Sequence, residues 1–576
     1  MSKAATLDTV DESESSSFDA LYYLAKAQNA LEEQNLLLVA ENLIKAHLIE
    51  PDEVEILATL ADIQFRLEHW KESLSTLKLL INLQPNELNW HINRLHALDS
   101  CKAYEQVIEE ALSLLDAYSN EEKILYFLAS AYYQSGSFPL GLETIETLID
   151  RYPTDPDHLV VRGLIYRSMG DRERAKTDLF KAESLGGNTT ALFNAMAALH
   201  HEMSEHEIAL DYFSKALVVN QEQGQVPQIA LNASFCAMCL GDFDKAWQFY
   251  AYRKYSGSVI KETRFQSWQG ENLSGKHLVV RREQGLGDEV RFASLIPEIA
   301  NEARSLTLEC DSRLIELYQR SFSHNVALVG TRSTNSETEH GESYVDVNYA
   351  AHIGDLAHFK RRSLDDFPEH YGYLQPDPKR VSYWSDYLDG LGGKLNVGVS
   401  WKSGNTTGIR SNYYTNIEHW LPVFAIEGIN FVNLYYGDSE EELKWVEAQI
   451  GVKVHVPKGI DLKNDLDDLS ALMASLDLVV GPHTAPVDLA MAVKGASVWV
   501  LPFRKFNTRG GFYFGQSYFP WAPATKPVFG DGFKGTMDVV AEELAHIVQT
   551  HDPKLTLAEL SKIMYCCYGA PLNDIP

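Results

Sequence analysis

Small residues recur at a fixed interval of 34 positions through the first half of the chain. Two such series are Ala129, Gly163 and Ala197, and Gly141, Ala175 and Ala209; a third position on the same interval has Leu148, Ala182 and Ala216. They lie within amphipathic helical segments, where a small side chain lets two helices approach closely. A helical hairpin of this length cannot cover its own apolar face, so successive hairpins must stack into a superhelix with a concave groove. The sequence therefore predicts a helical repeat array over residues 18–256.

The spacing of the small and aromatic residues resembles the tetratricopeptide repeat. The resemblance is best over residues 120–220, whereas residues 86–119 keep the repeat length but have lost most of the small residues. An unrelated helical array is the alternative.

After residue 256 short apolar strands alternate with helical stretches and glycine-rich turns, which predicts parallel sheets with crossover helices. The predicted strands are His277–Arg282, Ser305–Cys310, Asn396–Trp401, Ile429–Tyr436, Asp477–Gly481 and Ser497–Pro502. The glycines at Gly390–Lys394 suggest a hinge between two lobes. The predicted fold class is α + α/β, divided into a disordered tail (1–17), the repeats (18–256), a first lobe (257–392), a second lobe (393–550) and a C-terminal tail (551–576).

A formal net charge of −30 argues against nucleic acid and anionic membrane surfaces as partners, because both would be repelled. The six cysteines form neither a disulfide framework nor a paired CxxC zinc motif. No apolar run approaches the roughly 18 residues of a membrane span. We expect a cytoplasmic protein without membrane insertion.

The strand His277–Arg282 leads directly into the turn EQGLGDEV, which begins at Glu283. Gly285 and Gly287 permit a tight turn and a close approach of the backbone to a ligand, and the following helix points its N-terminal amides into the same space. Tight packing alone would also explain such a turn.

The segment Phe265–Pro297 resembles the start of the glycosyltransferase-like domain that follows tetratricopeptide repeats in many bacterial proteins. That domain is similar to the heptosyltransferases of glycosyltransferase family 9. The resemblance continues through Val397–Gly404, Ile409–Ser411, Phe431–Asp438, Leu466–Ala490 and Pro520–Phe529. It implies a GT-B fold, in which the second lobe binds a nucleotide sugar and the acceptor approaches from the first lobe.

The same resemblance implies that Asp288 is the general base that takes a proton from the acceptor hydroxyl. Glu283 is a second carboxylate that could share or take this role. Alternatively, Asp288 only caps its helix.

The resemblance implies cationic contacts to the donor phosphates from Lys402 and Arg410, and we include Arg504 among the donor-binding residues. No metal or other cofactor is expected, because basic side chains and helix N-termini would balance the departing phosphate. Lys402 follows a predicted parallel strand, where open sheets bind ligands. An ordinary solvated surface charge is the alternative for Lys402 and Arg410.

The segment Gly481–Gly495 predicts a strand, a loop and a helix. Thr484 is expected to cap this helix, and the amides near Ala485 and Pro486 would face the donor. Relatives commonly have Asp in place of His483 and His in place of Asp488, and often Gln in place of Tyr435. The exchange either preserves a coupled pair or marks an altered or lost activity.

Two other groups contain residue types that can bind metal. The acidic residues Asp465, Asp467 and Asp468 precede a helix, where they favour its N-terminal dipole end. His200, His201 and His206 lack a matching ligand set in the sequence and are expected on a solvated helix face. Cys236 and Cys239 are expected to be core thiols.

These features predict a metal-independent, inverting glycosyltransferase that moves a sugar from a nucleotide-sugar donor to a protein or peptide acceptor held by the repeats. One alternative is a non-catalytic interaction scaffold with a degenerate transferase domain. Another is a transferase that acts on a lipopolysaccharide-type glycan.

Overall fold

A computed structural model describes residues 19–219, 226–255, 265–283, 285–331, 344–368, 372–404, 414–493, 497–501, 519–523, 525–530 and 532–550. The predicted tails at 1–17 and 551–576 lie outside these ranges. The chain divides into two compact units, and the division falls after Gly187.

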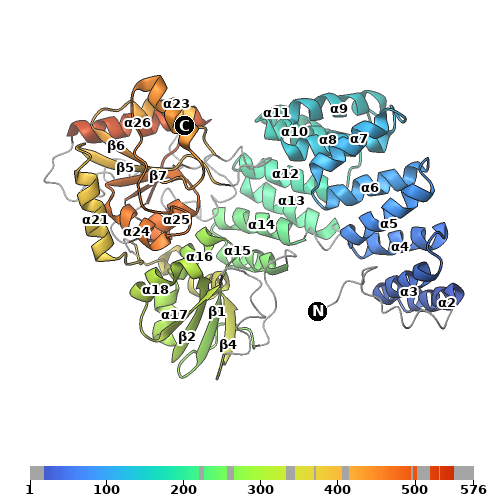
Figure 1. The fold of residues 1–576 in the computed structure, drawn as a ribbon, viewed down its shortest axis with the longest axis horizontal. Helices are drawn as coiled ribbons and strands as arrows, with labels where there is room; N and C mark the ends of the chain where they lie inside the picture. Colours follow the sequence, from blue (N-terminus) through green and yellow to red (C-terminus); the bar gives the residue numbers. More distant parts are fainter. Residues whose placement is uncertain are drawn as a thin grey trace. The chain divides into compact units, whose positions relative to one another are not determined.

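The first unit is built of consecutive helices that pair as hairpins (Figure 1). The first helices of successive pairs begin at Ala20, Val54, Leu88, Glu122 and Pro156, so the 34-residue interval predicted from the small residues is present in the helices themselves. The weakest predicted repeat, 86–119, also forms its two helices. The bounds are α2 Ala20–Glu32, α3 Leu36–Ile49, α4 Val54–Arg66, α5 Trp70–Leu83, α6 Leu88–Ser100, α7 Tyr104–Leu115, α8 Glu122–Ser135, α9 Phe138–Arg151, α10 Pro156–Ser168 and α11 Arg172–Ser184.

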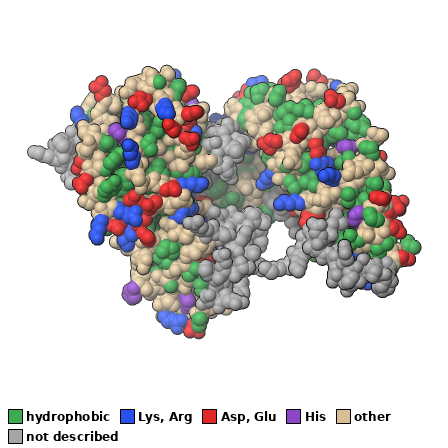
Figure 2. All heavy atoms as spheres, in the orientation of Figure 1, with side chains coloured by type: hydrophobic (Ala, Val, Ile, Leu, Met, Phe, Trp, Pro, Cys, Tyr) green, Lys and Arg blue, Asp and Glu red, His purple; other side chains and the backbone are tan. Residues whose placement is uncertain are grey.

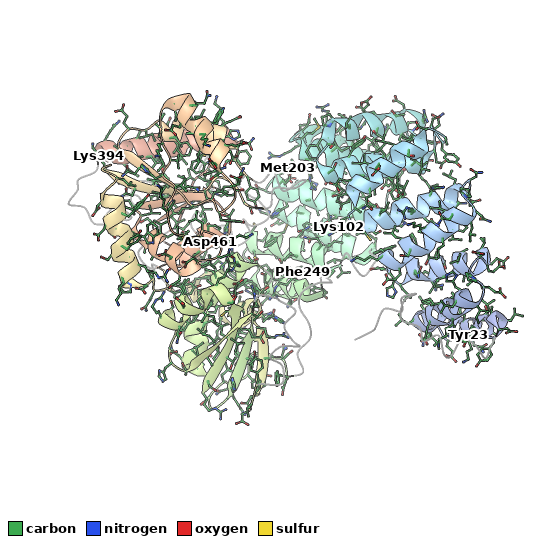
Figure 3. The ribbon with its side chains drawn as sticks, in the orientation of Figure 1. Tyr23, Lys102, Met203, Phe249, Lys394 and Asp461 are labelled. Atoms are coloured by element: carbon green, nitrogen blue, oxygen red, sulfur yellow. The ribbon has the colours of Figure 1, made fainter. Side chains whose placement is uncertain are left out.

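The recurring small residues lie where helices approach most closely. Ala129 and Ala175 are fully buried, and a Cβ on Gly163 would lie only 2.9 Å from Cγ of Leu179. A Cβ on Gly141 would lie 3.2 Å from Cδ1 of Ile165. Side chains fill the space between the paired helices (Figure 3). The repeat prediction is confirmed for the described part of this unit.

The second unit begins with four more helices: α12 Thr190–Glu202, α13 His206–Val219, α14 Val226–Cys239 and α15 Phe243–Tyr250. Trp247 of α15 donates from Nε1 to the carbonyl of Arg361 at 2.6 Å. Aromatic residues of α14 and α15 share one core with the first sheet. The compact units therefore divide within the predicted repeat segment 18–256, because its last helices pack on the α/β region.

Two parallel sheets follow (Figure 1). The first has the strand order β3-β2-β1-β4 and the second β6-β5-β7-β8-β9. Their bounds are β1 His277–Arg281, β2 Ser305–Asp311, β3 Val326–Thr331, β4 Tyr349–His352, β5 Leu395–Val399, β6 Ile429–Asn433, β7 Leu478–Pro482, β8 Val498–Leu501 and β9 Thr525–Pro527. All six predicted strands are present, and β3, β4 and β9 were not predicted. The predicted parallel-sheet α/β region is thus confirmed.

Helices connect the strands of both sheets. Helix α21, which precedes the predicted hinge at Gly390–Lys394, packs on α24. Acidic and basic side chains gather over these two helices on the face shown in Figure 2. The helix bounds are α16 Leu286–Ala293, α17 Ile296–Glu302, α18 Ile315–Ser321, α20 Leu356–Lys360, α21 Pro378–Asp389, α22 Leu421–Phe424, α23 Glu440–Ile450, α24 Leu466–Ser475, α25 Ala485–Ala492 and α26 Gly532–Thr550.

Replacing Gly163 with valine should destabilise the repeats by about 1 to 3 kcal/mol, because the added atoms overpack the contact with Leu179. Unfolding in urea, followed by far-UV circular dichroism, measures this loss. Thr177→Val on the exposed face of α11 is the control, since it adds no volume to that contact. Equal losses in both variants would contradict the packing argument.

Candidate functional site

In each sheet there is one pair of neighbouring strands from which the chain connections run to opposite sides of the sheet. Open parallel sheets bind ligands at the carboxyl ends of the strands at such a position. In the first sheet this position lies between β1 and β4, and in the second between β5 and β7. The predicted site residues follow the carboxyl ends of these strands and of β6. Glu283 follows β1, Lys402 follows β5, Tyr435 follows β6, and His483 follows β7.

The glycine turn after β1 leads into α16, which begins at Leu286 with Gly285 at its N-cap. Asp288 therefore lies inside the first helical turn, and no side chain caps the helix. The alternative that Asp288 acts as a cap is not seen. Its side chain is 32% exposed, so its carboxylate can meet a solvent-borne ligand.

Gly287 is needed because α25 lies directly against α16. A Cβ at this position would lie 2.3 Å from Oδ2 of Asp488 and 3.4 Å from Cα of Ala485. Close packing thus accounts for Gly287, and a ligand is not needed to explain it. A Cβ on Gly285 would instead meet Oδ2 of Asp288 at 3.0 Å.

Arg291, three residues after Asp288, connects the two sheets' helices. Its Nη1 donates to Oδ1 of Asp288 at 2.9 Å, and its Nη2 donates to Oδ1 of Asp488 at 2.6 Å. Its Nη2 also lies 3.0 Å from Nε2 of His483. The Arg291 side chain is only 2% exposed. Burial acts to lower the pKa of Arg291, but Asp488 and Asp288 outweigh it and hold that pKa above its ordinary value.

The predicted coupled pair of His483 and Asp488 is present. Nε2 of His483 lies 2.9 Å from Oδ1 of Asp488, and both side chains are buried. A neutral Nε2 can either donate to Asp488 or accept from Arg291, but it cannot do both. This pair contacts Arg291, and its role in the structure is to complete a buried charge cluster.

Glu283 is also buried and belongs to a second cluster. Arg253 contacts both of its carboxylate oxygens, with Nη2 donating to Oε1 at 2.5 Å. The backbone amide of Gly354, just after β4, donates to the same Oε1 at 3.1 Å. Arg253 also donates to Asp355 at 2.8 Å. These contacts join β1, β4 and the turn after α15, so the geometry assigns Glu283 to the fold and leaves Asp288 as the accessible carboxylate.

Lys402 lies near the carboxyl end of β5, as predicted, and is held by a carboxylate. Its Nζ donates to Oε1 of Glu442 at 2.7 Å and lies 5.2 Å from the centre of the Tyr435 ring. The ring of Tyr435 in turn packs on Trp401. Lys402 and Tyr435 thus form one cluster at the carboxyl edge of the second sheet.

Thr484 occupies the N-cap position of α25, but its side chain makes no capping hydrogen bond. Its hydroxyl is buried and has no hydrogen-bond partner among the described residues. Thr484 is therefore the N-cap residue, as predicted, but its side chain does not provide the expected capping hydrogen bond. Ala485 begins the helix and Pro486 lies in its first turn, as predicted. Arg410 and Arg504 lie outside the described residues.

A hollow of about 720 Å³ opens beside the Lys402 and Tyr435 cluster. Its lining comes from the end of β6, from α23 and from the loop before α24, and includes Asn433, Tyr435, Ser439, Lys444 and Asp461. Tyr435 is the predicted donor-binding residue that lines it.

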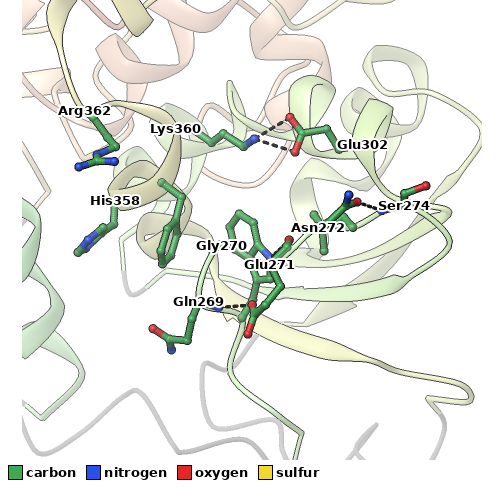
Figure 4. Close-up of a pocket in the computed structure, with 12 residues that line it drawn as sticks. Gln269, Gly270, Glu271, Asn272, Ser274, Glu302, His358, Lys360 and Arg362 are labelled. Atoms are coloured by element: carbon green, nitrogen blue, oxygen red, sulfur yellow. Dashed lines mark hydrogen bonds and ion pairs between the residues drawn. The ribbon is translucent and has the colours of Figure 1, made fainter.

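Another hollow, of about 760 Å³, is lined by residues 268–274, by Glu302 at the end of α17 and by residues of α20 and just after it (Figure 4). Lys360 points across it to Glu302, and its Nζ donates to Oε1 at 2.6 Å. Trp268 and Phe359 line its floor with their rings 4.9 Å apart. None of the predicted catalytic or donor-binding residues lines this hollow.

The acidic residues lie at the N-terminal end of α24, as predicted, although Asp467 and Asp468 are in its first turn and do not precede it. Asp465 is the N-cap and accepts from the amide of Asp468 at 3.1 Å. Asp467 pairs with Arg320, and Asp468 accepts from Nε1 of Trp384 at 2.8 Å.

The prediction of solvated histidines is wrong. His200, His201 and His206 are buried in α12 and α13. Nδ1 of His200 lies 2.5 Å from Oε2 of Glu205, and its ring stacks on Tyr212. Burial and then His206 lower the pKa of His201 to about 3, so its imidazole is neutral. These histidines face the interior because the helices that follow cover them.

Arg291, Arg253 and Glu442 were not singled out from the sequence. Arg291 could have been found from its spacing, because residues three apart share a helix face and Asp288 precedes it by three. The partners of Arg253 and Lys402 are 30 and 40 residues away, and no local pattern indicates them.

No protein-family model matches the chain. The chain is 34% identical over 360 residues to Protein FlbA of Caulobacter vibrioides, a match that covers 60% of this chain and 56% of FlbA. It is 24% identical over 147 residues to the TPR repeat-containing protein YpiA of Bacillus subtilis, which covers 25% of this chain and 34% of YpiA. The chain thus spans about half or less of the curated relatives it matches.

Solved structures that are similar to the chain include a tetratricopeptide repeat protein from Parabacteroides merdae, with 14% identity, a TM-score of 0.36 and coverage of 41% of this chain and 93% of that one. Another is YrrB, described as a TPR protein with an unusual peptide-binding site, with 14% identity, a TM-score of 0.26 and coverage of 34% of this chain and 98% of YrrB. The repeat assignment rests on the helices described above. Among the described helices, none has the length and apolar character that a membrane crossing requires.

Replacing Arg291 with methionine should destabilise the second unit by about 3 to 5 kcal/mol, because Asp488 would keep a buried charge without its cation. Urea unfolding of the full chain, followed by tryptophan fluorescence, measures the loss. Arg362→Met is the matched control, since Arg362 forms an exposed ion pair with Asp244 that should contribute at most about 1 kcal/mol. Similar losses in the two variants would contradict the assigned role of Arg291.

Proposed function

We propose that the chain is a metal-independent, inverting glycosyltransferase of GT-B type that moves a sugar from a nucleotide-sugar donor to a protein acceptor held by the helical repeats. The observation that carries the proposal is the placement of Asp288. Its partly exposed carboxylate lies at the N-terminal turn of α16, and Arg291 connects that turn to the residues that follow β7. The carboxylate that we propose as the base therefore lies, through Arg291, next to the end of β7, where the second sheet would bind the donor.

Asp288 has the chemistry that the proposed reaction needs. A general base must take the proton from the acceptor hydroxyl as the oxygen attacks the anomeric carbon. Arg291 fixes the orientation of the carboxylate through one oxygen, Oδ1. The other oxygen is then available to receive a proton.

The donor would bind at the carboxyl edge of the second sheet, beside Lys402 and Tyr435. The adjoining hollow of about 720 Å³ is within the usual size range for small-molecule sites. Lys402 would balance the departing diphosphate without a metal, and the first turn of α25 would add its helix dipole. Binding would require Lys402 to exchange Glu442 for a phosphate.

The repeats support the choice of a protein or peptide acceptor, since a stack of helical hairpins presents an extended concave surface. The name of YrrB's structure records a peptide-binding site in a protein of this repeat type.

A non-catalytic interaction scaffold is the second candidate. It is favoured because side chains of this chain already contact the residues that would bind the donor. His483 and Asp488 are buried against Arg291, and Lys402 is paired with Glu442. Nucleotide binding with donor turnover distinguishes the transferase from the scaffold. A lipopolysaccharide-type acceptor would be distinguished by transfer to glycan and not to protein.

Replacing Asp288 with asparagine should lower the turnover of donor hydrolysis or transfer by about 10² to 10⁴, the range for loss of a general base, while nucleotide affinity changes little. Isothermal titration with UDP, GDP, CMP and ADP identifies the nucleotide, and a hydrolysis assay then measures turnover. Glu283→Gln should mainly lower stability, because Glu283 is held by Arg253. Normal turnover in Asp288→Asn would place the base elsewhere.

Replacing Lys402 with alanine should weaken nucleotide affinity by about 10 to 100 fold, the equivalent of one charge-assisted contact of about 1.5 to 3 kcal/mol. Lys526→Ala is the matched control, since Lys526 has the same exposure, pairs with Glu543 and lies 5.1 Å from the Trp499 ring, but belongs to β9 at the sheet edge. Affinity should be the same with and without EDTA. A tenfold loss on chelation, or equal effects of the two lysines, would contradict the proposed phosphate site.

A further inference from the structure

Three side chains that bind transition metals converge inside the helical part of the second unit. His201 lies near the end of α12, His206 begins α13, and Cys236 lies in α14. All three are buried, and one ligand atom of each lies within 4.8 Å of the others. The sequence hides this arrangement, because Cys236 follows His201 by 35 positions.

The distances match those of ligands around a single ion. Nδ1 of His201 lies 3.1 Å from Nδ1 of His206 and 3.0 Å from Sγ of Cys236. Zinc binds imidazole nitrogen at about 2.0–2.1 Å and thiolate sulfur at about 2.3 Å with tetrahedral angles, which places two nitrogens about 3.3 Å apart and a nitrogen and a sulfur about 3.5 Å apart. The two contacts of His201 would lengthen by only about half an ångström or less on coordination, and the ligand atoms of His206 and Cys236 already lie within 4.8 Å of each other.

Hydrogen bonds between the three groups explain the arrangement less well. Nδ1 of a neutral imidazole carries either one proton or one lone pair. Nδ1 of His201 has two close polar neighbours, His206 and Cys236, so a single proton or lone pair is shared between two contacts. A cation at the centre would accept a lone pair from each of the three atoms at once.

We propose that His201, His206 and Cys236 bind a zinc ion. Two imidazoles and a thiol form a nitrogen and sulfur set that suits zinc, whereas magnesium and calcium require oxygen ligands. On binding, the Cys236 thiol gives up its proton to solvent, and the thiolate becomes a ligand. Three protein ligands leave a fourth position for water or another donor.

The ligands come from three successive helices, so the ion would cross-link the α12–α13 hairpin to α14. Residues of α14 also belong to the core that contains the first sheet. Zinc would therefore stabilise the connection between the last helical hairpins and the α/β region. This role is independent of the proposed transferase reaction, whose residues lie at the carboxyl edges of the sheets.

Cys239 provides a matched control within the same helix. It lies three residues after Cys236 and is half-buried, yet it is not part of the group of three whose ligand atoms lie close together. Cys310, a buried thiol of β2 in the first sheet, is a second control.

The test uses the full chain after removal of metal with a chelator. Zinc should bind with a stoichiometry of one per chain in competition with a chromogenic chelator, and it should raise the thermal midpoint. Cobalt, used in place of zinc, should give the visible spectrum of a tetrahedral site and a thiolate-to-cobalt charge-transfer band. Magnesium should give neither effect.

Cys236→Ser should abolish the charge-transfer band and weaken zinc affinity more than about 100-fold. Such a loss exceeds the roughly 10- to 100-fold effect of mutating a residue that only hydrogen-bonds to a metal ligand. His206→Gln should weaken affinity similarly, whereas Cys239→Ser and Cys310→Ser should leave both readouts unchanged. Far-UV circular dichroism confirms that each variant is folded. Absence of the charge-transfer band in the unmodified chain, or an effect of Cys239→Ser equal to that of Cys236→Ser, would overturn the proposal whatever the behaviour of the other variants.

Discussion

The buried guanidinium of Arg291 determines how the two parallel sheets of the second unit are joined. It contacts Asp288 on its own helix and both His483 and Asp488 after β7. A buried cation must be balanced by carboxylates, so these contacts are mutually dependent and loss of one partner leaves the others unbalanced. The same contacts fix the close approach of α16 and α25 that only glycine at Gly287 permits. Positioning of the proposed base and packing of the two lobes thus depend on one side chain.

A second buried ion pair has a similar role where the helices meet the first sheet. Arg253, in the turn after α15, contacts Glu283 and Asp355 at the ends of β1 and β4. Together with the Trp247 contact to Arg361, it makes α15 part of the α/β core. Helices that continue the repeats in the sequence therefore belong to a different compact unit from the repeats before them. The repeat interval in the sequence does not show that the two units divide after Gly187.

The sequence predicted features that depend on local spacing. The 34-residue interval of Ala129, Gly163 and Ala197 predicted the length of the helical repeat, and apolar runs predicted six strands. Short strands without a strong apolar run, such as β9, were missed. Residues of the candidate site such as Asp288 and Lys402 were predicted, but their partners Arg291 and Glu442 were not. The pairing of Lys402 with Glu442, and outside this site the approach of Cys236 to His201, join segments 40 and 35 residues apart. Such contacts arise from tertiary packing, which no local pattern encodes.

The proposed donor site illustrates how a strongly acidic chain can bind an anion. The net charge of −30 repels a diphosphate at long range, but that repulsion is screened over about 8 to 10 Å at physiological salt, whereas contacts in the site are not. Lys402 is held by Glu442 on α23, the helix that also lines the adjoining hollow. A phosphate that takes Lys402 must therefore displace the Glu442 carboxylate. Donor affinity at the proposed site would then depend on the difference between two contacts of Lys402, one with phosphate and one with Glu442.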